Sequence, residues 1–117
     1  MIFGAHVMVY SCDAAADRAF VRDVLEFDSV DAGDGWLIFA LPPAELAVHP
    51  SDTGGRHELY LMCDDLEATM RELRAKGVEF AREVGSERWG RVTAILLPSG
   101  AELGLYEPRH PTALADR

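Results

Sequence analysis

The two halves of the chain repeat one another, and this repetition restricts the possible fold more than any other feature of the sequence. Three residues of the first half recur in the second half in the same order, and the two sets are His6, Cys12 and Asp13, then His57, Cys63 and Asp64. The offset is the same for each pair, since 57 − 6, 63 − 12 and 64 − 13 all equal 51. Further along, the run AELAV at 44–48 is echoed by AELGL at 101–105, at an offset of 57. The chain is therefore predicted to be one supersecondary unit written twice, with about six extra residues late in the second copy.

Each copy shows the pattern of a strand, a helix and three further strands. In the first copy, alternating apolar residues predict a strand over 5–10, and Asp13 is a natural N-cap for a helix that ends near Leu25. Further strands of this copy are expected at 27–31, 36–41 and 45–49. The second copy repeats this order, with strands at 57–63, 78–82, 91–97 and 102–107 and a helix capped by Asp64 or Asp65.

The predicted fold is α+β, with two βαβββ modules whose strands form a curved, cup-shaped mixed sheet with the helices outside. Module one covers about 4–50, module two about 56–107, and an irregular tail follows at 108–117. The extra residues of module two fall in a charged segment at 83–90, which we expect to be a loop. At 117 residues the chain is too short for two independent domains, so we expect a single one.

The composition excludes some classes of partner. The chain carries 11 Lys and Arg against 20 Asp and Glu, for a formal net charge of −9, and nucleic-acid phosphates require the opposite balance. No apolar run approaches the roughly 18 residues of a membrane span, and no basic or signal-type segment follows Met1. We interpret Cys12 and Cys63 as small apolar residues of a reduced, cytoplasmic protein.

The order of these features resembles the vicinal oxygen chelate superfamily, which includes glyoxalase I, bleomycin-resistance proteins and extradiol dioxygenases. The resemblance rests on a histidine that opens the first strand of each copy, on Trp89-Gly90, and on the run PSGAEL at 98–103. It covers about 4–107 of the chain. It implies two modules that form a cup around a small-molecule ligand, often in a homodimer, and we expect both for this chain.

Enzymes of this family hold a divalent metal ion that chelates two vicinal oxygens of the substrate and acts as a Lewis acid. The resemblance implies ligands on the first and last strand of each module, and His6 and His57 match the first-strand positions. The glutamate of the last strand falls at Gly104, and its equivalent in module one is Ala47, so neither position offers a ligand. Glu102 lies two residues away and could serve only through a shifted register. The candidate metal ligands are thus His6, His57 and Glu102.

A wider set of residues is expected to line the cup, because these side chains are aromatic, apolar or hydrogen-bonding and lie on the strands or the loop that face it: His6, Met8, Tyr10, Trp36, His49, His57, Trp89 and Tyr106. Each has a plainer interpretation. The aromatic residues and the methionine also suit an ordinary core, and Trp89 suits either a lid over the cup or an anchor for its own loop.

Three functions remain open from the sequence. We expect a protein that binds a small organic ligand without an intact family metal site and therefore without a cofactor, since Ala47 and Gly104 leave that site incomplete. The second function is a lyase, isomerase or extradiol-type dioxygenase that uses one divalent metal ion held by His6 and His57, with Glu45 or Glu107 as general base. The third is a non-catalytic interaction or regulatory module whose cup is filled by its own side chains.

Overall fold

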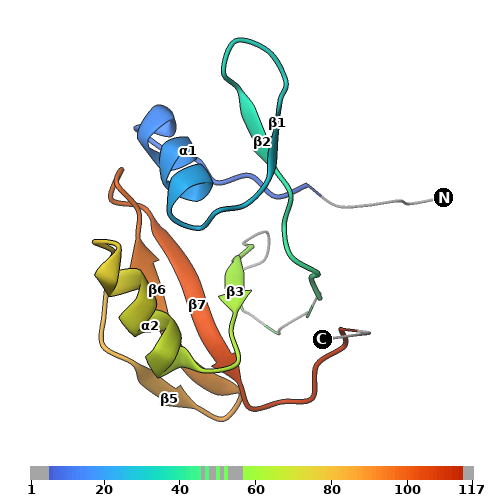
Figure 1. The fold of residues 1–117 in the computed structure, drawn as a ribbon. Helices are drawn as coiled ribbons and strands as arrows, with labels where there is room; N and C mark the ends of the chain where they lie inside the picture. The colour runs from blue at the N-terminus through green and yellow to red at the C-terminus, as the bar shows by residue number, and fades with distance from the viewer. Residues whose placement is uncertain (1–5, 46, 48–49, 51, 53–56, 115–117) are drawn as a thin grey trace, which may run out of the picture.

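The computed structural model describes residues 6–45, 47, 50, 52 and 57–114 (Figure 1). Its helices and strands in this part of the chain are, in order, α1 (Ala14–Asp23), β1 (Ser29–Asp31), β2 (Leu37–Phe39), β3 (Tyr60–Met62), α2 (Leu66–Ala75), β4 (Glu79–Phe80), β5 (Gly85–Glu87), β6 (Gly90–Leu96) and β7 (Glu102–Pro108). The predicted α+β class is confirmed. No helix among the described residues is long and apolar enough to span a membrane.

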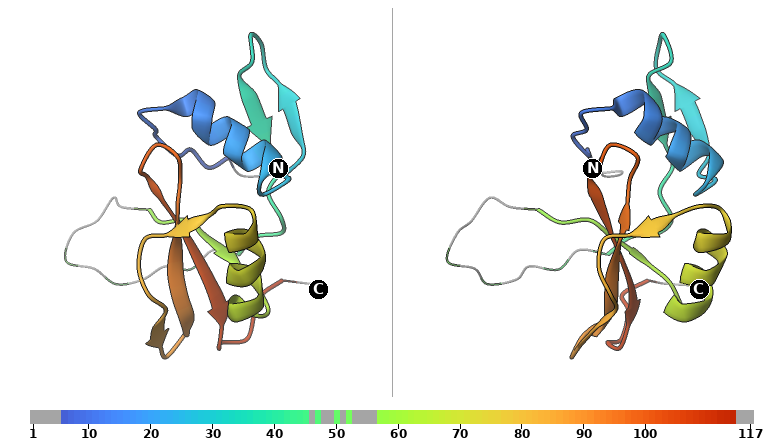
Figure 2. Two further views of the ribbon diagram at one scale, coloured as in Figure 1. Left: turned by 60° about the vertical axis from the view of Figure 1, so that its left-hand side comes forward. Right: turned by 90° about the vertical axis from the view of Figure 1, so that its left-hand side faces the viewer.

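Module two forms the complete unit that the sequence predicts. Its strands lie in the order β3-β7-β6-β4, and β5 pairs with β6 alongside this path. The sheet is mixed, because β3 runs parallel to β7 whereas the other pairs are antiparallel. Figure 2 shows α2 on one side of this sheet. The loop predicted over 83–90 is wrong in part, since it contains β5 and its turn; the run GSE of β5 is short and polar and carries no apolar alternation.

The two helices begin where the sequence places their caps. The Asp13 side chain accepts a hydrogen bond from the Ala16 amide at 3.1 Å and caps α1. Asp65, rather than Asp64, caps α2 in the same way, because its side chain accepts from the Ala68 amide at 3.1 Å. Each cap satisfies a backbone donor that a first helical turn leaves without an intrahelical partner.

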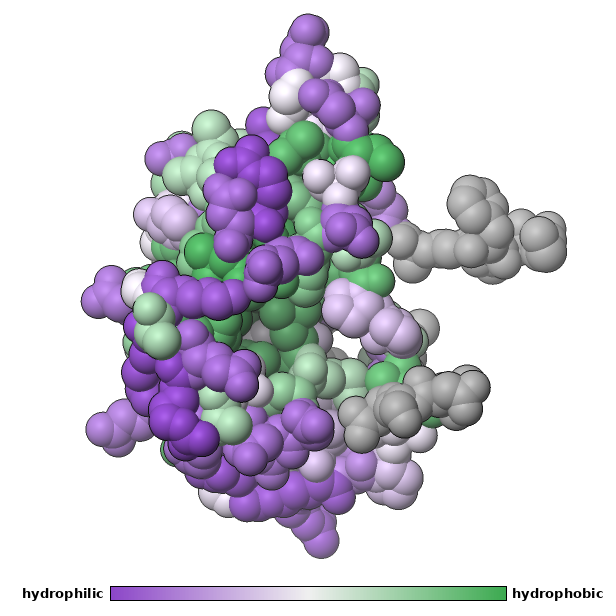
Figure 3. Space-filling model, in the orientation of Figure 1, coloured by the Kyte–Doolittle hydropathy of each residue, from purple (hydrophilic) through white to green (hydrophobic). Residues whose placement is uncertain are grey.

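Among its described residues, module one lacks the first and last strands that complete the sheet of module two. Residues 6–10, predicted as part of the first strand, form no strand, and neither do 45 and 47 of the predicted last strand; positions 46, 48 and 49 lie outside the described residues. Among the described residues of this module, β1 and β2 pair as an antiparallel hairpin. All but one of the exposed large hydrophobic side chains of the described chain belong to this module, namely Val7, Met8, Val9, Tyr10, Val30, Trp36, Ile38 and Leu41. Hydrophobic side chains gather below the hydrophilic tip of the hairpin in Figure 3.

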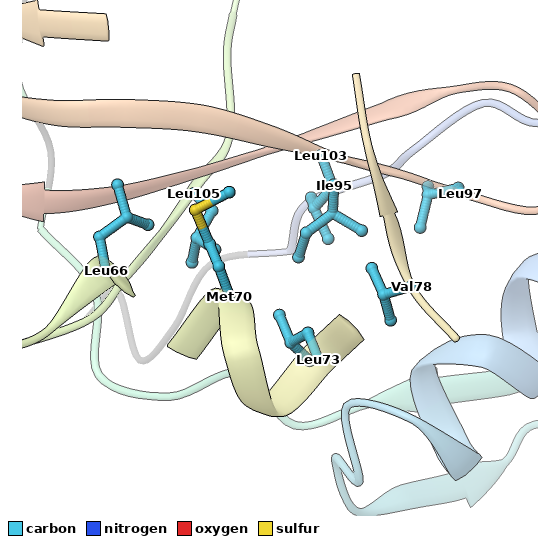
Figure 4. Packing of buried hydrophobic residues seen from close by; sticks show 8 residues of the cluster. All are labelled: Leu66, Met70, Leu73, Val78, Ile95, Leu97, Leu103 and Leu105. Atoms are coloured by element: carbon cyan, nitrogen blue, oxygen red, sulfur yellow. The ribbon is translucent and has the colours of Figure 1, made fainter. Parts of the chain in front are cut away.

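The buried core belongs to module two. Its members lie on α2, on β6 and β7, or directly beside β4 and β6, and they are Leu66, Met70, Leu73, Val78, Ile95, Leu97, Leu103 and Leu105 (Figure 4). Leu66 and Ile95 have no exposed surface. Similar strand patterns therefore give a buried core in module two and an exposed apolar surface in module one.

A buried carboxylate joins the modules. Asp17 of α1, which is 8% exposed, accepts hydrogen bonds from the Ser99 amide at 3.1 Å and the Ser99 hydroxyl at 2.7 Å. Ser99 lies in the turn between β6 and β7, and both views of Figure 2 show α1 lying across this turn. The contact ties the helix of module one to the complete module of the same chain.

We expect Asp17→Ala to lower the free energy of unfolding by about 2 kcal/mol, because two hydrogen bonds to a carboxylate are lost and the Ser99 donors are left partly buried. Urea denaturation followed by circular dichroism measures this change. Asp23→Ala is the matched control: this carboxylate also lies on α1, but it pairs with Arg22 at the surface, so its loss should leave the free energy of unfolding nearly unchanged. Equal losses in the two variants would contradict the buried contact.

Candidate functional site

Three aromatic rings pack edge to face on module two, and we call Tyr60, Trp89 and Tyr106 the aromatic cluster. The ring centroids are 6.0 Å apart for Tyr60 and Trp89, 5.8 Å for Tyr60 and Tyr106, and 5.3 Å for Trp89 and Tyr106. The interplanar angles of 71° to 82° are those that the quadrupoles of aromatic rings favour. The three side chains hold one another in place on a surface of the sheet.

The cluster lies on the sheet face turned away from α2, which we call the distal face. Side chains alternate between the two faces of a strand, and Leu103 and Leu105 of β7 pack toward α2. Glu102, Gly104 and Tyr106 therefore belong to the distal face. This is the face that the sequence predicts to line the cup, because the helices are expected on the outside.

Trp89 is held in position by Arg109 of the tail. It lies in a two-residue turn, since Glu87 pairs with Gly90 across the β5–β6 hairpin. The Arg109 amide donates to the Trp89 carbonyl at 2.9 Å, and the Arg109 guanidinium donates to the Ser86 hydroxyl at 2.8 Å and to the Glu87 carbonyl at 2.9 Å. Arg109, in the tail that the sequence predicts to be irregular, thus supplies hydrogen-bond donors to this turn.

A second residue of the tail reaches Tyr106. The Tyr106 hydroxyl lies 3.0 Å from His110 Nε2, and His110 Nδ1 lies 2.7 Å from the Pro111 carbonyl oxygen. Because a carbonyl can only accept, Nδ1 carries the hydrogen, and in the neutral ring Nε2 accepts from the tyrosine. Burial, and then the negative charge of Glu45, raise the pKa of Tyr106 above its ordinary value. Tyr106 thus acts as a protonated hydrogen-bond donor.

Gly104 has no room for a side chain. A Cβ atom at this position would lie 2.7 Å from Cε1 and 2.9 Å from Cγ of the Tyr60 ring, and closer still to Cδ1. Tyr60 is the register partner of Gly104 on β3. The position that the resemblance assigns to a metal-binding glutamate is therefore covered by an aromatic ring.

The other candidate metal ligands are not gathered at this position. Glu102 forms an ion pair with Arg82 and is half exposed, and both His6 and His57 are exposed. Among residues 6–45, 47, 50, 52 and 57–114, no group of three or more His, Cys, Asp or Glu side chains is arranged to hold an ion. Together with the ring over Gly104, this donor set within one chain does not fit the metal of the family's enzymes.

The structure brings together two of the residues predicted to line the cup, Trp89 and Tyr106. Met8, Tyr10 and Trp36 are exposed on module one, where the Arg18 guanidinium lies 4.7 Å from the centroid of a Trp36 ring. His49 lies outside the described residues.

Sequence reasoning missed Tyr60 and His110. Tyr60 could have been found from its place between the strand residues that face α2, whereas His110 stands in a segment without a pattern.

The two cysteines are free thiols in different surroundings. Cys12 is exposed, with its thiol 3.5 Å from the Ser99 carbonyl. Burial raises the pKa of the Cys63 thiol above its ordinary value, and the nearby carboxylates of Glu107, Asp64 and Asp65 add to this rise. Cys63 therefore packs as a small apolar residue, as predicted, and neither its surroundings nor its pKa suit a nucleophile.

The comparisons with known proteins agree with this architecture. A model of the Glyoxalase/Bleomycin resistance protein/Dioxygenase superfamily matches residues 5–108. The crystal structure of TnmS3, an antibiotic binding protein from Streptomyces sp. CB03234, is similar with 24% identity and a TM-score of 0.62, over 92% of this chain and 99% of that one. A glyoxalase/bleomycin resistance protein from the same organism shows 25% identity and a TM-score of 0.57, over 84% of this chain and 94% of that one.

A lactoylglutathione lyase from Agrobacterium tumefaciens shares the fold as well, with 17% identity and a TM-score of 0.59, over 85% of this chain and 88% of that one. A comparison with curated protein sequences finds no match. The family match extends over both modules, from before His6 to the end of β7, and confirms the resemblance drawn from the repeat. The chain belongs to the glyoxalase/bleomycin resistance protein/dioxygenase superfamily.

Proposed function

We propose that this chain binds a small organic molecule on the distal face of module two, without a metal ion. The observation that carries the proposal is the aromatic cluster itself, which covers the position where the family's enzymes hold a chelating carboxylate. A surface of this kind recognises flat or apolar groups through their faces and edges, and it offers nothing to a pair of chelated oxygens.

The exposure of the cluster indicates where a ligand would make contact. Tyr106 is buried and Trp89 remains 39% exposed, so the indole is the ring most able to meet a ligand. The similarity to TnmS3, described as an antibiotic binding protein, supports a ligand of that type. We therefore propose a bulky, largely apolar molecule that carries an aromatic ring system.

The open surface of module one supports a homodimer as the functional state. The segment 7–10 exposes the side chains of Val7, Met8, Val9 and Tyr10, and apolar area exposed in this way is costly in water. A second copy presents a matching surface by symmetry, and it would complete the cup that one chain leaves open. Since its two cysteines are free thiols, we assign the protein to the reducing cytoplasm.

A thermal-shift screen with aromatic antibiotics tests the proposal, because a ligand that binds the folded state raises the melting temperature by mass action. For a compound found in this way, we expect Trp89→Ala to weaken binding about tenfold, as the loss of one ring contact implies. Isothermal titration calorimetry measures the change in affinity.

Arg88→Ala is the control for this variant, since it alters the same turn and leaves the ring in place. Equal affinity of Trp89→Ala and the wild type would remove the indole from the binding surface. A screen in which no compound shifts the melting temperature would favour a cup filled by its own side chains.

A further inference from the structure

Position 104 lies at the centre of the distal face and is framed by its register partners on both neighbouring strands. On one side stands Tyr60 of β3, and on the other Ala94 of β6, which is 2% exposed. Positions 94 and 104 carry small residues, and the Tyr60 ring lies over Gly104.

The ring cannot easily give way to a side chain at 104. Three of its atoms would lie within 3.0 Å of a Cβ atom there, which is closer than such contacts occur in folded proteins. Trp89 and Tyr106 pack against the same ring with centroid distances of 6.0 and 5.8 Å, so a rotation of Tyr60 would break both contacts. A side chain at position 104 would therefore disturb the packing of all three rings of the aromatic cluster.

Two other glycines of the same sheet show how specific this arrangement is. A Cβ atom at Gly85 would meet only ordinary contacts with Val92, at 3.7 and 3.9 Å. A Cβ atom at Gly90 would strike the Glu107 carbonyl oxygen, which belongs to the backbone. At Gly104, by contrast, the three nearest atoms all belong to one side chain, which substitution can remove.

We propose that Tyr60 and Gly104 are a matched steric pair and that Tyr60 determines the specificity of the cup. While the ring is in place, no carboxylate-bearing residue can stand at position 104, and the ring itself offers an apolar surface to the ligand. A glutamate placed at position 104 would therefore meet the Tyr60 ring and could not turn its carboxylate toward the cup. This inference rests on the proposed function for the nature of the ligand, whereas the steric pair itself can be tested without any ligand.

The test is a double-variant cycle of thermal stability with Gly104→Ala, Tyr60→Ala and the combination of both. Gly104→Ala should lower the melting temperature by about 5 °C, as overpacking does, whereas Gly85→Ala should change it by less than about 2 °C. In the Tyr60→Ala background, Gly104→Ala should cause no further loss. If Tyr60→Ala does not fold, Tyr60→Val takes its place. The valine side chain has no atoms corresponding to Cδ1 and Cε1, the two ring atoms nearest to a Cβ atom at position 104.

Two outcomes would overturn the steric pair. One is a Gly104→Ala variant as stable as the wild type, and the other is an equal loss with and without the Tyr60 ring. Gly90→Ala is the control for this double-variant cycle. Its added methyl group clashes with the Glu107 backbone, so it should lower the melting temperature equally with and without the Tyr60 ring.

Gly104→Glu tests the functional side of the inference. With Tyr60 present, this variant should be less stable than the wild type and should bind no Ni²⁺ in isothermal titration. A Gly104→Glu protein with the melting temperature of the wild type and one Ni²⁺ per chain would overturn the proposal. Because neither arm uses an organic ligand, failure of the ligand screen alone would count against the proposed function and leave the steric pair standing.

Discussion

Replacing Ile95 with alanine is expected to lower the free energy of unfolding by about 3 kcal/mol. Ile95 lies on β6, has no exposed surface, and packs in the cluster that contains Leu66 and Leu103. The substitution removes three carbon atoms and leaves a cavity that the close-packed neighbours cannot fill. Urea denaturation at equilibrium measures the loss, as a lower midpoint with an unchanged slope.

Ile38→Ala is the matched control, since it makes the same chemical change on β2 of module one. Ile38 is 37% exposed, so in dilute protein its truncation should cost less than about 1 kcal/mol. Equal losses at the two positions would mean that module one has a core of its own within the single chain.

Replacing Val9 with lysine is expected to weaken self-association about a hundredfold. Val9 is 48% exposed in the single chain and lies in the segment 7–10, which we propose to be covered by a second copy. A lysine there is harmless in the monomer and places an unpaired charge in an apolar interface in the dimer. Sedimentation equilibrium over a range of concentrations gives both dissociation constants.

Ala81→Lys is the control for charge, because Ala81 is exposed beside the end of β4 on module two. This variant should associate as the wild type does. A wild-type chain that stays monomeric at every concentration, or a Val9→Lys chain that dimerises normally, would contradict the proposed interface.

The structure shows which parts of the fold a sequence pattern can predict. Module two follows the pattern closely, because its first strand pairs with β7 of the same module and its helix is fixed by the Asp65 cap. The segment at 6–10 has the same alternation and forms no strand. A pattern gives the tendency of a segment to be a strand, whereas the strand itself needs a neighbour that donates and accepts its hydrogen bonds. In module one that neighbour is missing among the described residues.

The site could be predicted only in part, for a related reason. Trp89 and Tyr106 are conspicuous by residue type, and the structure places them together. The repeated histidines predicted site residues at the start of each first strand. In the structure, the residue of β3 that lies over Gly104 is Tyr60. A signal existed, since an aromatic residue opposite a glycine in a sheet often covers the space that the glycine leaves. Reading it required the register of β3 against β7, which the sequence does not contain.

We propose that the distal face of module two presents an aromatic surface and no metal centre, and a metal titration distinguishes the two directly. Wild-type protein, His6→Ala and His57→Ala are purified without chelator and titrated with Zn²⁺ and Ni²⁺ by isothermal calorimetry. We predict no stoichiometric binding that depends on either histidine. One ion per chain in the wild type, lost in both variants, would contradict the claim.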